Sequence, residues 1–329
     1  MKNMDIYRKV LPFSLQRLLV GVIGILASCI ITLTGFFITR GNDDLCVIVT
    51  AICGIVGLIA FGLIVKYMGY LLKAGQIAMI TRAVTEGSLP QDVVAAGKAE
   101  VKARFLTASL YFAIFGGIKA ITGQITRGID GITSSLSKLG GDDSTAGNVL
   151  GIIGGLISAF ISIVLEYVNY CCLGWVFYNK NQNAFKSTCD GAVIYFQNWK
   201  TLLKNAGKVL GLTIASLVVI GGILSGISCL IAGNLFDAAS LDAIALEVEG
   251  NTLSGSDILY GGAVVVGLLF WGLLHSVFVA PYFLVSVMRS YMDSARTTTI
   301  GVDIYGKLCS LSKKFTDMFR RAEEEPAQA

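Results

Sequence analysis

Apolar residues gather in six long runs along this chain, and polar, mostly basic connections separate the runs. The runs cover approximately residues 18–39, 45–65, 105–125, 149–177, 207–236 and 258–288. About 20 consecutive apolar residues in a helix cross a bilayer, so the pattern predicts six spans. The connection at 40–44 is very short, which requires a tight hairpin of the first two spans. We therefore expect an all-α polytopic integral membrane protein, with six transmembrane helices arranged as three hairpins and amphipathic juxtamembrane helices.

The segments that flank this six-span domain (18–288) are amphipathic. Residues 1–17 precede the first span, and residues 289–329 form a tail after the last one. In the tail, large apolar residues recur at helical spacing opposite a basic face: Ile304, Leu308, Leu311, Phe315, Met318 and Phe319. This predicts a membrane-surface or partner-binding helix. We expect the chain beyond the acidic run Glu323–Glu325 to be disordered.

The stretch 116–141 has one apolar face although it extends past the third span. Its large apolar residues follow one another at gaps of three or four positions: Ile118, Ile121, Ile125, Ile129, Ile132, Leu136 and Leu139. The other face is mainly Gly, Ser and Thr. A helix that lies flat on a membrane usually has a strongly charged polar face. An interaction helix within the protein or between copies is therefore favoured over an interfacial helix or a pore lining.

The three predicted hairpins follow one another at intervals of roughly 90 to 110 residues. Each has a basic segment before its first span and an amphipathic stretch after its second. Internal repeats of this kind occur in many transport proteins. A triplicated hairpin is one interpretation; regular loop lengths in any six-span protein are the other.

The composition agrees with a membrane protein. The chain of 329 residues is 54% hydrophobic and only 15% charged, with a mean hydropathy of +0.70, whereas soluble domains carry about 25% charged residues. The 38 glycines suit closely packed membrane helices. The first apolar run has no small-residue cleavage motif, so we expect a retained span and not a signal peptide.

The distribution of basic residues predicts the orientation. Of the 26 Lys and Arg residues, 22 lie in segments that six alternating crossings would place on one side, and residues 237–257 contain acids but no base. Cytoplasmic loops are rich in Lys and Arg. Both termini are therefore expected in the cytoplasm, with a plasma or inner membrane favoured over an organelle membrane. The basic residues either bind anionic lipids there or only set the topology.

Residues for catalysis or metal binding are scarce. The chain has one histidine, His275, which excludes a multi-histidine metal site. We expect it to be a hydrogen-bonded packing residue. The eight cysteines show no disulfide framework or zinc spacing. The segment 301–308 resembles a phosphate-binding loop but has Leu308 in place of the required Ser or Thr. We expect no enzyme activity, no cofactor, no metal and no nucleic-acid partner.

Two charged residues lie inside predicted spans, Lys119 in the third and Glu166 in the fourth. A charge at membrane depth usually has a partner or a water-filled cavity. At 1.5 Å per residue the two depths differ by about one helical turn, so the residues could form a pair; otherwise Lys119 reaches the outer surface and Glu166 lies near the inner one.

These observations support two functions. The first is a passive channel or secondary transporter for a small solute or ion, with Lys119 and Glu166 near its path. The alternative is a non-catalytic, oligomeric membrane scaffold that assembles through the 116–141 helix and the tail. A homo-oligomer is expected in both cases, and a partner protein could bind the tail.

Overall fold

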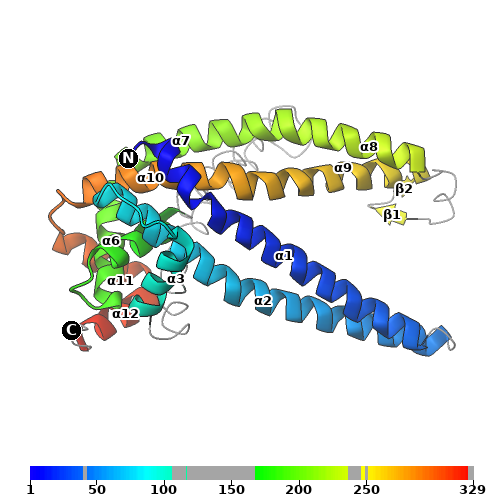
Figure 1. Cartoon of the computed structure of the whole chain (residues 1–329), viewed down its shortest axis with the longest axis horizontal. Coiled ribbons are helices and arrows are strands. Elements are labelled where there is room, and N and C mark those ends of the chain that lie inside the picture. Colours follow the sequence, from blue (N-terminus) through cyan, green and yellow to red (C-terminus); the bar gives the residue numbers. More distant parts are fainter. Residues whose placement is uncertain (40–42, 106–115, 117–166, 236–245, 249–250, 325–329) are drawn as a thin grey trace. The chain divides into compact units, whose positions relative to one another are not determined.

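The computed structural model describes residues 1–39, 43–105, 116, 167–235, 246–248 and 251–324 (Figure 1). It is predominantly helical, and it divides into two compact units, residues 1–206 with 281–329 and residues 207–280. In the described part, four helical stretches are long and apolar enough to cross a membrane: Asn3–Thr39, Ile52–Thr85, Gly207–Leu235 and Gly255–Ala295. They contain the predicted first and sixth spans and cover most of the predicted second and fifth spans. Most of the predicted spans 105–125 and 149–177 lies outside the described residues.

The first hairpin consists of α1 (Asn3–Thr39) and α2 (Asp43–Thr85), which lie side by side in Figure 1. Small residues bring the two backbones together. A Cβ atom on Gly57 would lie 3.1 Å from the Ser28 carbonyl oxygen, and one on Gly24 would meet the Phe61 ring. The Ser28 hydroxyl also donates to the Gly57 carbonyl at 2.8 Å. Such contacts hold helices together in lipid, where burial of apolar surface gives no net driving force.

The second unit consists of most of another hairpin, whose two helices continue along the chain into residues of the first unit. Its first helix runs through α7 (Trp199–Ser216), a π-helical turn η1 (Leu217–Gly221) and α8 (Gly222–Leu235). Its second helix runs through α9 (Gly255–Leu274), a π-helical turn η3 (His275–Val279) and α10 (Ala280–Ala295). Between them, β1 (Leu246–Val248) and β2 (Asn251–Leu253) pair antiparallel, with Leu246 opposite Leu253. Ser254 and Asp257 then form a capping box that starts α9.

The two hairpins use equivalent residues at their contacts. The segment "VIGILASCIITL" at 22–33 aligns with "VIGGILSGISCL" at 219–230, and "VGLIAFGL" at 56–63 aligns with "VGLLFWGL" at 266–273. In this alignment the contact of Gly24 with Phe61 corresponds to that of Gly221 with Trp271. The contact of Ser28 with Gly57 corresponds to that of Ser225 with Gly267. Sequence and contacts together support a repeated unit for the first and last hairpins; the predicted middle hairpin lies largely outside the described residues.

The other helices of the first unit form a compact bundle, which we call the helical domain (residues 1–14, 71–105, 167–197 and 281–324). It combines the start of α1, the end of α2, α3 (Val93–Arg104), the helix at 167–178, α6 (Ala184–Gln197) and most of α10. Apolar side chains change from exposed to buried where a helix enters it. In α1, Ile30 is 64% exposed, whereas Ile6 is fully buried. We infer that the exposed part faces hydrocarbon and that the domain lies outside the membrane.

The segments that follow the first and last predicted hairpins meet the end of the predicted fourth span inside this domain. A Cβ atom on Gly174 would lie 3.0 Å from the Thr81 hydroxyl of α2 and would overlap the Met288 side chain of α10. Gly174 therefore allows the helix at 167–178 to lie against both α2 and α10. The prediction that the fourth span extends to residue 177 is therefore wrong at its end, because residues 167–177 are almost all buried against other helices of this domain.

The tail folds back onto its own chain. It forms α11 (Val302–Leu311) and α12 (Lys313–Glu324), and both contact α6. Leu308, Phe315 and Met318 of the predicted apolar stripe are buried, and the Asn183 side chain donates to the Ala322 carbonyl at 3.1 Å. The helical prediction is thus confirmed, but the apolar face packs against α6 and not against a membrane surface. The expected disordered end, residues 325–329, lies outside the described residues.

Replacing Gly267 by Ala should destabilise the α8–α9 hairpin, because the added Cβ overlaps the Ser225 backbone. Overpacking of this kind costs about 1–3 kcal/mol, measurable as a loss of unfolding free energy of the full chain in detergent. Gly272→Ala is the matched control in the same helix, since its Cβ meets no atom within 4 Å. Equal stabilities of the two variants would contradict this account of the hairpin.

Candidate functional site

The loop that follows the helix at 167–178 is held in place by Arg104, the last residue of α3. This side chain is buried, with 7% of its surface exposed. Its guanidinium donates hydrogen bonds to the carbonyl oxygens of Val176, Asn179, Lys180 and Gln182 and to the Ser187 hydroxyl. The last carbonyls of a helix have no partner within it and carry partial negative charge. Arg104 therefore caps this helix from a distant part of the sequence.

Burial lowers the pKa of the Arg104 guanidinium from its ordinary value. Arginine nevertheless stays charged in proteins, so the carbonyl oxygens receive hydrogen bonds from a buried cation. Bonds of this kind are stronger than those between neutral groups. These hydrogen bonds hold residues 179–182 of the loop in one conformation, as the lining of a binding site requires.

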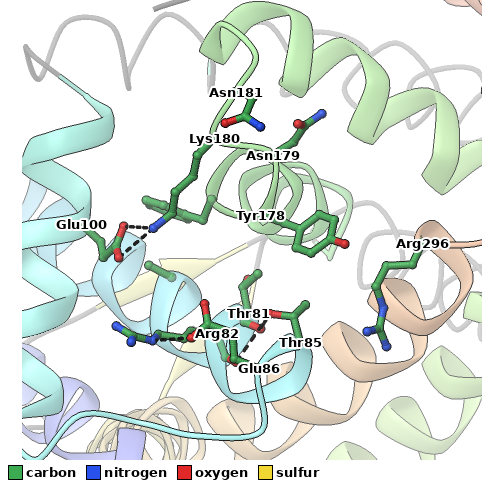
Figure 2. Close-up of a pocket in the computed structure, with 12 residues that line it drawn as sticks. Thr81, Arg82, Thr85, Glu86, Glu100, Tyr178, Asn179, Lys180, Asn181 and Arg296 are labelled. Carbon is green, nitrogen blue, oxygen red and sulfur yellow. Dashed lines mark hydrogen bonds and ion pairs between the residues drawn. The ribbon is translucent and has the colours of Figure 1, made fainter. Parts of the chain in front are cut away.

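A polar cavity of about 330 Å³ opens beside this loop (Figure 2). It is formed by the end of α2, by α3, by the loop and by the end of α10. The lining residues are Ala78, Thr81, Arg82, Thr85, Glu86, Glu100, Phe177, Tyr178, Asn179, Lys180, Asn181 and Arg296. The ends of the segments that follow the first and last hairpins thus contribute to the same cavity as the end of the helix at 167–178.

Each basic residue of the cavity has an acidic neighbour. Lys180 pairs with Glu100 at 2.8 Å, Arg82 with Glu86 at 2.8 Å, and Arg296 with Asp293 at 3.1 Å. These pairs are partly exposed and contribute little stability, so breaking one of them has a low energetic cost. Figure 2 shows the Tyr178 ring between the α2 side chains and Arg296.

Thr81 provides a buried polar group at the base of the cavity. The residue is only 2% exposed, and its hydroxyl has no hydrogen-bond partner among the described residues. The Thr85 hydroxyl donates instead to the Thr81 carbonyl at 2.9 Å. Buried hydroxyls are usually paired, and an unpaired one calls for an explanation; a bound solute or water in this cavity is one.

A second polar cluster joins the loop to the tail. Asp190 of α6 accepts hydrogen bonds from Gln182 at 2.9 Å and from the Tyr305 hydroxyl of α11. Lys186 lies 3.5 Å from the same carboxylate and above the rings of Tyr305 and Phe319. Burial raises the pKa of the Asp190 carboxyl, and the charge of Lys186 opposes this effect. All groups of this cluster are engaged with one another, so it serves to anchor the tail.

The site residues predicted from sequence are mostly not placed by the structure. Both residues of the predicted charge pair, Lys119 and Glu166, lie outside the described residues. The same holds for the apolar residues of the predicted interaction helix: Ile118, Ile121, Ile125, Ile129, Ile132, Leu136 and Leu139. His275 is placed, and its Nε2 lies 3.2 Å from the Thr213 hydroxyl oxygen, as expected for a hydrogen-bonded histidine. No group of three or more metal-ligating side chains occurs in the described part of the chain.

The cavity itself was missed at the sequence level. The sequence pattern used its basic residues only to predict the orientation in the membrane. These residues include Arg82, Arg104, Lys180 and Arg296. One signal in the sequence is Glu100, a single acid between Lys98 and Lys102 in a basic connection, which indicates that it pairs with a basic residue. Its partner Lys180 is 80 residues away, beyond the reach of any spacing rule.

Comparisons with protein-family models, with curated proteins and with solved structures found no match to this chain.

Replacing Arg104 by Lys should destabilise the helical domain by about 3 kcal/mol or more. A lysine cannot reproduce the planar set of donors, and buried acceptors of charged hydrogen bonds would lose their partners. Thermal or denaturant unfolding of the detergent-solubilised protein measures this loss. Lys102→Met, at an exposed position of the same helix, should change the stability by less than about 0.5 kcal/mol. Similar losses in both variants would argue against the capping role.

Asp190 should make the stability of the helical domain depend on pH. Its raised pKa means that the folded protein holds the proton more tightly than the unfolded chain does. The resulting stability is present below the ordinary aspartate pKa of about 3.9 and is lost as the pH rises through the raised pKa. Asp190→Asn cannot ionise, so unfolding measured from about pH 4 to pH 7 should show a flatter decline.

The control for this titration is Asp293→Asn, because the Asp293 carboxylate is exposed and paired on its own helix. It should keep the pH profile of the unmodified protein. An Asp190→Asn profile as steep as that of the unmodified protein would exclude Asp190 as the titrating group.

Proposed function

We propose that this chain is a passive channel or secondary transporter for a small polar solute or ion, with six membrane-spanning helices arranged as three hairpins. A parity argument supports the number six. Residues 105 and 167 both belong to the helical domain, so the chain between them must cross the membrane an even number of times or not at all. The apolar residues 106–125 and 149–166 would supply two crossings, in addition to the four candidate spans.

The charge distribution supports a cytoplasmic location of the helical domain and of both termini. The basic segments that precede and follow the spans gather in this domain, and such segments remain on the cytoplasmic side. The N-terminus is bound there, since the Arg289 guanidinium donates to the Met1 carbonyl at 2.7 Å. A plasma or inner membrane with anionic lipids facing these basic residues fits this orientation.

The cavity at the end of α2 carries the proposal. Its volume of about 330 Å³ is at the lower end of the range of about 300–1,000 Å³ for small-molecule sites. Rearrangeable ion pairs and the buried Thr81 hydroxyl suit a small polar solute. Thr81 lies 16 residues after Val65, the predicted end of the second span, or about 24 Å along the helix. The cavity would therefore collect solute on the inner side, and Lys119 and Glu166 remain candidates for the path through the membrane.

The scaffold alternative has less support. It relied on the apolar face of the tail, which is packed against α6, so a partner protein would have to bind the polar face of the tail instead. Its other element, the 116–141 helix, lies outside the described residues except for Gly116. Homo-oligomerisation through that helix is compatible with either function.

Purified protein in liposomes should conduct or exchange at least one member of a panel of small solutes, such as potassium, chloride, phosphate, glycerol and amino acids. Light scattering and a potential-sensitive dye report the flux. Arg296→Ala should lower that flux about tenfold or more, which corresponds to a loss of about 1.4 kcal/mol in solute or transition-state binding.

Arg320→Ala is the matched control, because Arg320 pairs with Asp317 three residues away as Arg296 does with Asp293, yet does not line the cavity. It should leave the flux unchanged. Flux no greater than in protein-free liposomes for every solute would refute transport and favour the scaffold. Flux that is insensitive to Arg296→Ala would remove the cavity from the path.

A further inference from the structure

The last hairpin contains a closed network of four polar and aromatic residues. The Thr213 hydroxyl oxygen lies 3.2 Å from His275 Nε2, and the His275 and Trp271 ring centroids are 5.3 Å apart. Trp271 Nε1 in turn donates to the Ser216 hydroxyl at 3.3 Å, and that hydroxyl donates to the Thr213 carbonyl at 2.9 Å. The interactions thus run from one helix of the hairpin to the other and back.

This network lies inside helices that are apolar enough to span a membrane. Thr213 is six residues into the candidate span that begins at Gly207, or about 9 Å along the helix. His275 lies in the candidate span Gly255–Ala295. Ionisable residues within spans are costly and usually mark a functional site.

Both helices depart from α-helical geometry at the network. The π-helical turn Leu217–Gly221 begins directly after Ser216, and the turn His275–Val279 begins at His275 itself. Short π-helical turns are rare and frequently occur at functional sites. Two such turns lie on the two helices of the hairpin beside the same polar cluster. They are a second observation, independent of the hydrogen bonds, that indicates a functional site.

The first hairpin provides an internal comparison. It repeats the backbone contacts of the last hairpin, with Phe61 at the position of Trp271. In the same alignment, Gln16, Leu19 and Val65 stand at the positions of Thr213, Ser216 and His275. The described parts of α1 and α2 are also α-helical throughout. A hairpin of this kind therefore holds together without the network, so helix packing alone does not account for these residues.

The network suits a proton as its ligand. Neutral imidazole has one donor and one acceptor nitrogen, and a hydroxyl can pair with either; the protonated ring only donates, and the Thr213 hydroxyl can accept. The indole of Trp271 can stabilise the resulting cation through its π face. Histidine is also the side chain whose ordinary titration falls between about pH 5 and pH 8.

The described residues of this unit include few other charges. Among the described residues of 207–280, the charged ones besides His275 are Lys208, Glu247 and Asp257, and the remaining titratable side chains are those of Cys229 and Tyr260. Lys208 precedes Thr213 by five residues, and Asp257 precedes His275 by 18.

We propose that Thr213, Ser216, Trp271 and His275 form a proton-binding site within the last hairpin, and that protonation changes the geometry of the adjoining π-helical turns. The acceptor nitrogen of His275 takes up the proton from water, and the Thr213 hydroxyl turns to accept a hydrogen bond from the charged ring. This proposal goes beyond transport, because proton binding is measured on the protein without any solute.

The single histidine makes the test direct. Full-length protein with isotope-labelled histidine gives ring NMR signals from His275 alone. The signals should titrate between about pH 5 and pH 8, and the indole N–H signal of Trp271, assigned with Trp271→Phe, should move with the same midpoint. Ring signals that stay in the neutral form over this range, or an indole signal that does not respond, would overturn the proposal.

Variants separate the network from a general effect of span hydroxyls. Thr213→Val should shift the midpoint by about half a pH unit or more, roughly a threefold change in proton affinity, whereas Thr213→Ser should keep it. Thr32→Val in the first hairpin is the matched control, since the Thr32 hydroxyl donates to the Ser28 carbonyl of its own helix at 2.9 Å. An identical midpoint in Thr213→Val and Thr32→Val would exclude Thr213 from the site. Circular dichroism verifies the helical content of each variant, and either outcome leaves the flux test of transport independent.

Discussion

Close contact between helix backbones in hydrocarbon is the constraint on which this structure depends. Apolar side chains gain little by meeting each other in lipid, so helices associate through small residues that allow dispersion contacts and short polar bonds. Both described hairpins achieve this close contact in the same way. Their first helix has a Gly and a Ser one helical turn apart, and their second helix has a Gly that contacts the Ser. The larger residues then remain on the surface, as the exposed Ile and Leu side chains of α1 and α2 show.

The helical domain follows from the continuity of these helices. Because α1, α2 and α10 run beyond their apolar exposed parts, the helices that contain candidate spans also contribute to a buried core. Different interactions hold that core: it buries large side chains such as Phe13, Tyr291 and Phe315, and a buried arginine satisfies the end of the helix at 167–178. The end of α2 lines the cavity, and so does Arg296, which directly follows α10.

The difference between the two hairpins is informative because their similarity is so close. Equivalent contacts show what is needed to join two helices, and the polar network around His275 is additional to that need. A polar cluster in lipid has a cost that a purely structural hairpin avoids. Two π-helical turns lie directly beside these polar groups, and such turns occur frequently at functional sites.

The sequence by itself determined the class of protein, the described spans, and the helical character of the tail. These properties depend on local composition and on the 3.6-residue period, which can be read from neighbouring positions. It predicted the apolar stripe of α12 but not its location, because a stripe of this kind has the same pattern whether it covers a membrane or another helix. Only the tertiary structure decided that Phe315 and Met318 pack against α6, that Arg104 caps a helix more than 70 residues away, and that Lys180 meets Glu100. Such partners are set by how the chain folds back on itself, and sequence spacing carries no record of distances in space.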